Sequence, residues 1–168
     1  MLVLTGCNTH PEIIPPTTAV HEAPRQGPTA RIVFHDLNFS SDTAFGKGYF
    51  LIHELDEQGC TLPGRLVRFE PGRRKAPVTV PAGRDIAISK HEFVHMSLGM
   101  FEDSECVMAV RTRLRPGERV FSYSITSALG CSLRFYRKRD YWHGPSDFIP
   151  VHKMRLVKGS KPARFCSN

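Results

Sequence analysis

Residues 105–137 read ECVMAVRTRLRPGERVFSYSITSALGCSLRFYR, and this stretch decides the expected fold. Arginines alternate with Thr112 and Leu114 in its first part, and aromatic residues alternate with serines around Tyr123. Such a period of two is typical of β-strands, whose successive side chains point to opposite faces. Pro116-Gly117 favours a turn after the first run, and Gly130 precedes a third run. The stretch therefore predicts three consecutive antiparallel strands near 105–114, 119–126 and 131–137.

The alternation also assigns a core-facing side to each predicted strand. These sides are Cys106, Met108, Val110, Thr112 and Leu114 in the first strand, Phe121, Tyr123 and Ile125 in the second, and Cys131, Leu133 and Phe135 in the third. Four cysteines, Cys60, Cys106, Cys131 and Cys166, allow three pairings as two disulfides. Because Cys106 and Cys131 face the same core, we expect them to pair, and Cys60–Cys166 follows by elimination.

The rest of the chain continues the same pattern from Ala30 onward. Short β-branched and aromatic runs recur between Gly, Pro, Asn and Asp turns, without a convincing amphipathic helix. They predict further strands near 30–37, 48–55, 64–69, 77–80, 84–93 and 148–157. With 168 residues, of which 40% are hydrophobic, the chain suits one domain with a substantial core. We expect an all-β fold, an antiparallel β-sandwich over residues 30–168.

The N-terminus carries a different signal. Leu4-Thr5-Gly6-Cys7 resembles the lipobox of bacterial lipoproteins, in which cleavage precedes a cysteine that then carries lipid. The resemblance implies that residues 1–6 are the remnant of a signal peptide and that Cys7 is lipidated. Residues 8–29 contain five prolines and no sustained apolar period, so 7–29 is expected to be the lipidated cysteine and a flexible linker. Asn8, rather than aspartate, follows the cysteine, which favours the outer membrane.

A family resemblance covers roughly residues 30–137. Val80-Pro81-Ala82-Gly83-Arg84, Cys106, the run LRPGERV at 114–120 and Cys131 are similar in order to a group of small bacterial envelope lipoproteins without an established activity. In that group an "I-P-A-G-K" strand precedes two paired cysteine strands. Residues 90–103 and the tail after Arg139 depart from the pattern. The resemblance implies an immunoglobulin- or transthyretin-like β-sandwich and a cell-envelope location, and it implies no catalytic residues.

One motif suggests catalysis. His91-Glu92-Phe93-Val94-His95 matches the HExxH zinc motif, in which two histidines one helical turn apart bind zinc and the glutamate acts as general base. Asp85–Ser89 has a strand pattern, so we expect a strand here, with His91 and His95 about 13 Å apart. The alternative, a small zinc metallopeptidase, would use His91, Glu92 and His95, with Glu118 or His143 as a third ligand.

The remaining polar residues carry weaker signals. We expect His35, His53, His143 and His152 to be surface or structural residues. The only tryptophan, Trp142, follows the basic run 137–139, and we expect it to cap the sandwich rather than stack on a glycan. The formal net charge is +7 and the pI is about 9.4. Outside the cytoplasm such charge favours anionic envelope polymers or lipid headgroups over nucleic acid.

Taken together, these signals predict a non-enzymatic, lipid-anchored envelope lipoprotein that faces the periplasm and serves as a binding or structural module. Its expected partners are the membrane, through the lipid anchor, and an envelope protein or anionic envelope polymer. No cofactor, metal or nucleic acid is expected. Two alternatives remain, the zinc metallopeptidase and an accessory lipoprotein of a secretion system, of which the second depends on fold analogy alone.

Overall fold

A computed structural model describes residues 18–35, 44–96, 104–127, 130–137 and 147–167. These residues form only β-strands and connections, without an α-helix, and none of their segments is a helix that could cross a bilayer. The strands are β1 (Thr29–His35), β2 (Ala44–His53), β3 (Arg65–Leu66), β4 (Lys75–Pro81), β5 (Asp85–Met96), β6 (Ser104–Arg113), β7 (Arg119–Ser127), β8 (Gly130–Tyr136), β9 (His152–Lys153), β10 (Arg155–Leu156) and β11 (Phe165–Cys166). The all-β prediction is confirmed.

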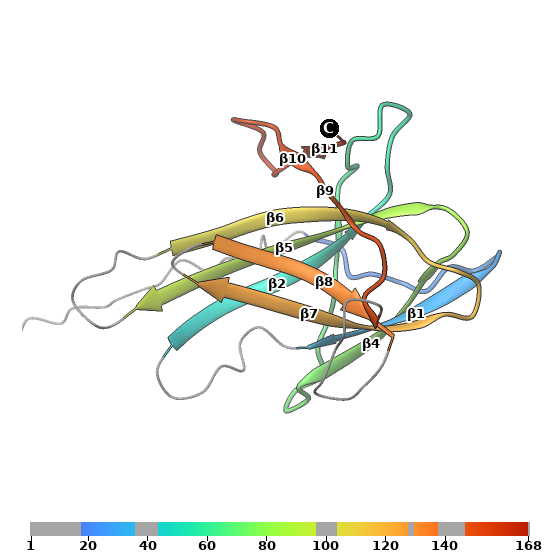
Figure 1. Ribbon diagram of the computed structural model, residues 1–168, viewed down its shortest axis with the longest axis horizontal. Coiled ribbons are helices and arrows are strands. Elements are labelled where there is room, and N and C mark those ends of the chain that lie inside the picture. The colour runs from blue at the N-terminus through green and yellow to red at the C-terminus, as the bar shows by residue number, and fades with distance from the viewer. Residues whose placement is uncertain (1–17, 36–43, 97–103, 128–129, 138–146, 168) are drawn as a thin grey trace, which may run out of the picture.

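Two sheets form the layers of a sandwich (Figure 1). One has the strand order β4-β1-β7-β8, and the other has the order β3-β2-β5-β6-β9. Neighbouring strands are antiparallel except β1 and β7, which are parallel. The hairpin β10–β11 forms a separate two-stranded sheet near the C-terminus, beside the long loop that follows β2.

The core lies between the two layers and draws on both. Phe34 of β1 and Phe135 of β8 come from one sheet, and Phe50 of β2 comes from the other; all three are fully buried. The ring centroids of Phe34 and Phe50 are 4.9 Å apart, and those of Phe34 and Phe135 are 6.3 Å apart. Burial of such side chains contributes roughly 1.5–3 kcal/mol each to folding, so this cluster accounts for much of the attraction between the sheets.

The prediction that β6, β7 and β8 are three consecutive paired strands is wrong. β6 pairs with β5 and β9, whereas β7 pairs with β1 and β8 in the opposite sheet. The turn at Pro116-Gly117 therefore crosses between layers. Gly117 donates its N–H to Thr29 O, and Glu118 O accepts from the N–H of Arg31, so the turn hydrogen-bonds to β1 instead of returning to β6.

The predicted inner face of β7 is also wrong. Ser122 is buried, whereas Tyr123 and Ile125 are 38% and 47% exposed. Phe121 is buried on the outer face in a small cluster with Val33, Tyr136 and Phe148. Alternation gives β7 two faces, and the one that carries Phe121 is the outer face, where Val33, Tyr136 and Phe148 pack against that ring.

Both predicted disulfides are confirmed. Cys106–Cys131 links β6 to β8, with 6.0 Å between the Cα atoms, and it therefore joins the two sheets. Cys60–Cys166 joins the loop after β2 to the C-terminal strand. The predicted single strand at 148–157 is instead divided between β9 and β10, which belong to different sheets.

The described end of the proline-rich segment contacts the sandwich. Val20 forms a parallel β-bridge to Leu66, and the imidazole Nε2 of His21 lies 2.9 Å from Thr79 O. Cys7 and the first part of the predicted linker, residues 8–17, lie outside the described residues.

Candidate functional site

The HExxH sequence lies on a β-strand. Residues 91–95 belong to β5, which pairs along its length with β2 and β6. His91 stacks on Tyr49 of β2, whereas Glu92 faces the opposite side and forms an ion pair with Lys90. The helical turn that brings two histidines and a glutamate together in zincins is therefore not formed here. The side chain of His95 lies outside the described residues.

Lys90 and Glu92 instead form a charged pair inside the sandwich. The ammonium of Lys90 is fully buried and lies 2.7 Å from a carboxylate oxygen of Glu92. It also donates a hydrogen bond to the hydroxyl of Ser124 in the opposite sheet. Desolvation lowers the pKa of Lys90, and the neighbouring carboxylate of Glu92 opposes this effect. The hydrogen bond from Lys90 to Ser124 therefore connects the two layers.

On the outer face of the five-stranded sheet, His53, Ser89 and His91 form a hydrogen-bonded chain. His53 Nδ1 lies 2.8 Å from Leu62 O, and His53 Nε2 lies 2.8 Å from Ser89 Oγ. Ser89 Oγ lies 3.1 Å from His91 Nε2. All three side chains are buried, with His91 8% exposed.

The hydrogen bonds among His53, Ser89 and His91 define which nitrogen of each imidazole carries the proton. Because Leu62 O can only accept, His53 donates from Nδ1 and accepts at Nε2 from the Ser89 hydroxyl. The single hydroxyl proton of Ser89 is then used, so His91 donates from Nε2 to Ser89 Oγ. Nδ1 of His91 consequently carries a lone pair, and none of the described residues donates a hydrogen bond to it.

Burial keeps both imidazoles neutral. The pKa of His91 is lowered to about 4, mainly by desolvation and also by the nearby His53. The pKa of His53 is also lowered, mainly by desolvation, although its bond to Leu62 O opposes the shift. Tyr49, whose ring lies parallel to His91 with centroids 4.7 Å apart, has a raised pKa because of burial and the charge of Glu105.

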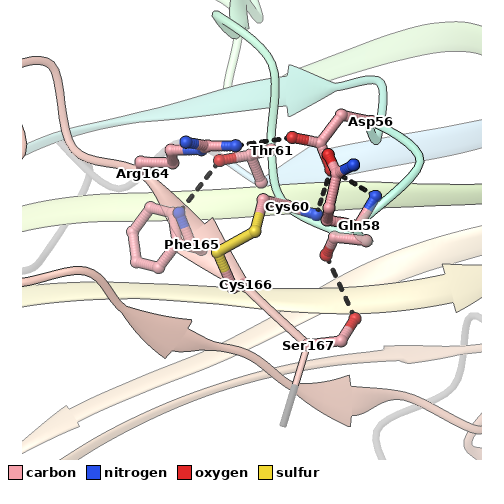
Figure 2. A network of polar contacts seen from close by, with 9 residues as sticks. Asp56, Gln58, Cys60, Thr61, Arg164, Phe165, Cys166 and Ser167 are labelled. Atoms are coloured by element: carbon pink, nitrogen blue, oxygen red, sulfur yellow. Dashed lines mark hydrogen bonds and ion pairs between the residues drawn. A yellow bond between two sulfur atoms is a disulfide. The ribbon is translucent and has the colours of Figure 1, made fainter.

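The C-terminal tail covers this face and is held by a polar network around the second disulfide (Figure 2). Asp56 accepts hydrogen bonds from the backbone N–H groups of Gln58 and Cys60 and forms an ion pair with Arg164. The bond from Cys60 N is the main reason why the pKa of Asp56 is lowered. Phe165 is fully buried, and its ring meets that of His91 edge-on at 6.2 Å.

An open groove of about 1080 Å³ lies between this tail and the sheet. Tyr49, His53 and His91 line it from the sheet, residues 61–65 line it from the loop, and residues 160–164 line it from the tail. Thr18 and Ala19 contribute from the N-terminal segment. The described lining contains Arg65, Lys161 and Arg164 but no aspartate or glutamate, although Arg164 is paired with Asp56 and the charge of Glu105 acts on Tyr49.

The polar side chains of the groove are largely bonded to one another. Ser89 is the hydroxyl between two histidines, but it is fully buried and both its hydrogen-bonding directions are used. Within the described residues, no group of three or more histidine, cysteine or acidic side chains is placed to hold a metal ion. The groove instead offers neutral hydrogen-bonding atoms, stacked rings and cations.

The other sequence candidates lie elsewhere. His35 bonds to the backbone of Ser122 through Nδ1 at 3.0 Å, and His152 is exposed on β9. Glu118 forms an ion pair with Arg137 at 2.9 Å, beside the turn after β6. Trp142 and His143 lie outside the described residues.

Sequence reasoning missed Tyr49, Ser89 and Lys161 as site residues. The signal available was the alternation of β2 and β5, which places Tyr49 with His53 and Ser89 with His91 on one face of each strand. The contribution of Lys161 had no local signal, because it depends on how the tail is attached. Comparison with protein-family models, with curated proteins and with solved structures finds no significant match for this chain.

Proposed function

We propose that this protein is a non-enzymatic binding module of the bacterial cell envelope, anchored by lipid at Cys7 in the outer membrane and facing the periplasm. The observation that carries the proposal is the pairing of the cysteines. Four of the five cysteines in the sequence form disulfides, and the fifth is Cys7 of the lipobox-like sequence. Disulfides persist in oxidising compartments and are rare in the cytoplasm.

The binding role is supported by the groove. Its described lining contains cationic side chains and no acidic one, and its hydrogen-bonding rings are held neutral by burial rather than poised to titrate near pH 7. General acid–base catalysis works best with a pKa near the working pH. A group whose pKa is about 4, beside a serine with no exposed surface, matches a binding surface better than a hydrolase.

The anchor is tested by growing the native host with labelled palmitate and comparing the natural protein with Cys7→Ala. We expect label only in the natural protein, recovered with outer-membrane fractions on a density gradient, and release of Cys7→Ala into the periplasm. Mass analysis of the N-terminal peptide should show a diacylglyceryl-modified cysteine. An envelope-associated protein with an unmodified Cys7 would contradict the anchoring proposal.

A further inference from the structure

We infer that the groove between the C-terminal tail and the five-stranded sheet binds a short peptide that ends in a free carboxylate. The assignment rests on the proposed envelope function only for the natural source of such a peptide, the carboxylated peptides of the cell wall. The contacts that define the ligand come from the groove itself, and they are of three kinds: cations at the rim, two polar atoms without partners, and an apolar wall.

The first contact is electrostatic. Arg65 on β3 and Lys161 on the tail are both exposed and line the groove. Neither has an acidic partner among the described residues, whereas Arg164 is already paired with Asp56. Two such cations attract an anionic group to the groove, although the charge of Glu105, which acts on Tyr49, lies near it.

The second contact is made by two side chains that line the groove and are more than nine-tenths buried. Tyr49 and His91 are each 8% exposed. No described residue bonds to the hydroxyl of Tyr49 or to Nδ1 of His91. One is a donor and the other a bare acceptor, so a complementary ligand offers both an oxygen acceptor and an N–H or O–H donor.

These requirements select among anionic ligands. A fatty acid supplies a carboxylate and an apolar body, but it has no hydrogen to donate to His91 Nδ1. A neutral sugar supplies hydroxyls but leaves Arg65 and Lys161 without a counter-charge, and an acidic sugar such as galacturonate adds the charge but has no apolar side chain for the wall of the groove. A peptide with a free carboxyl end supplies the carboxylate, a carbonyl oxygen for Tyr49 and an amide N–H for His91. Its side chains meet the apolar wall around Leu51, Pro63 and Pro162.

The groove lies close in sequence to the expected lipid anchor, which fits a peptide of the cell wall as the ligand. Thr18 and Ala19 form part of the lining, and Thr18 follows Cys7 by eleven residues. An extended chain spans at most about 3.3–3.6 Å per residue, or roughly 36–40 Å for this segment. A lipid-anchored Cys7 would therefore keep Thr18, at the edge of the groove, within about 40 Å of the membrane surface.

The test uses the full chain carrying Cys7→Ser, with its disulfides formed and without lipid. Peptide binding is then measured independently of lipidation, so a failure of the binding proposal can be told apart from a failure of the anchoring proposal. The probe is N-acetyl-D-alanyl-D-alanine, and binding is measured by calorimetry and by ¹⁵N NMR of the histidine rings. We expect a Kd of about 0.1–1 mM. We also expect a shift of the His91 Nδ1 resonance while the proton stays on Nε2.

Two variants and their controls complete the test. Tyr49→Phe removes one hydroxyl and should weaken binding about three- to tenfold. Lys161→Gln should weaken it severalfold and reduce its salt dependence, whereas Lys158→Gln, on the same tail but outside the lining, should have no effect. Near-UV circular dichroism of each variant checks that the fold is retained.

Ligands that differ from the peptide in one chemical respect provide the results that could overturn the assignment. The C-terminal amide of the same peptide should bind at least tenfold more weakly, since it lacks the charge. Equal binding of the amide, or unchanged binding in Tyr49→Phe and Lys161→Gln, would overturn the assignment. Tighter binding of galacturonate or dodecanoate than of the peptide would also overturn it and assign the groove to an acidic sugar or an acyl chain.

Discussion

The buried imidazole of His91 predicts that the fold loses stability in mild acid. In the folded protein its pKa is about 4, mainly because of desolvation. In the unfolded chain it returns to the ordinary value of about 6.5. Between these values the unfolded state binds the extra proton, so stability is complete above pH 6.5 and falls as the pH is lowered toward 4. Below pH 4 this histidine contributes no further loss.

The size of the effect follows from the two pKa values. Their difference corresponds to about 3 kcal/mol across the whole window, and to about 2 kcal/mol between pH 7.5 and pH 5.0. His53 is the titrating neighbour, and its own lowered pKa adds to the loss in the same direction. His91→Phe keeps a ring against Tyr49 and removes only the titration of His91.

The assay is denaturant unfolding at pH 7.5 and pH 5.0 with the disulfides intact. We expect the natural sequence to lose about 2 kcal/mol more over this interval than His91→Phe does. His152→Gln, at an exposed histidine, is the control and should behave like the natural sequence. An identical pH dependence in His91→Phe and the natural sequence would show that His91 is not held neutral by burial.

Three further perturbations test other contacts. Glu92→Gln should destabilise the fold by about 3–5 kcal/mol, since it leaves the ammonium of Lys90 buried without its counter-charge. Combining Lys90→Met with Glu92→Leu should restore most of that loss in the same unfolding assay, and an additive loss would refute this account. Replacing Cys60 and Cys166 together by serine should cost up to about 5 kcal/mol, because the bridge closes a separation of 106 residues; unchanged proteolysis of the tail would contradict its tethering role. Gly64→Ala should destabilise by about 1–3 kcal/mol, because the added methyl would lie 2.5 Å from the neighbouring imidazole, and an unaltered melting temperature would show that the loop can move away.

Much of the local structure could be predicted from residue patterns. The period of two around Cys106 and Cys131 identified β6 and β8 and the faces that pair in the disulfide. Recognising that Asp85–Ser89 is a strand pattern was enough to place His91 and Glu92 on opposite faces of the sheet. These predictions succeed because alternation is imposed by the backbone of each strand and needs no knowledge of its neighbours.

What the sequence could not determine was which layer each strand enters and what covers the outer faces. Pro116-Gly117 permits a hairpin or a crossing equally, and only the hydrogen bonds of Gly117 to β1 decide for the crossing. Likewise, the groove exists because a disulfide brings the tail at Lys161 against a sheet face contributed by Tyr49 and His91. Such contacts join residues far apart in the chain, so no local period encodes them. The sequence by itself determined most strands, the faces of β5, β6 and β8, and the cysteine partners, whereas the tertiary structure alone decided the sheet order, the inner face of β7 and the site.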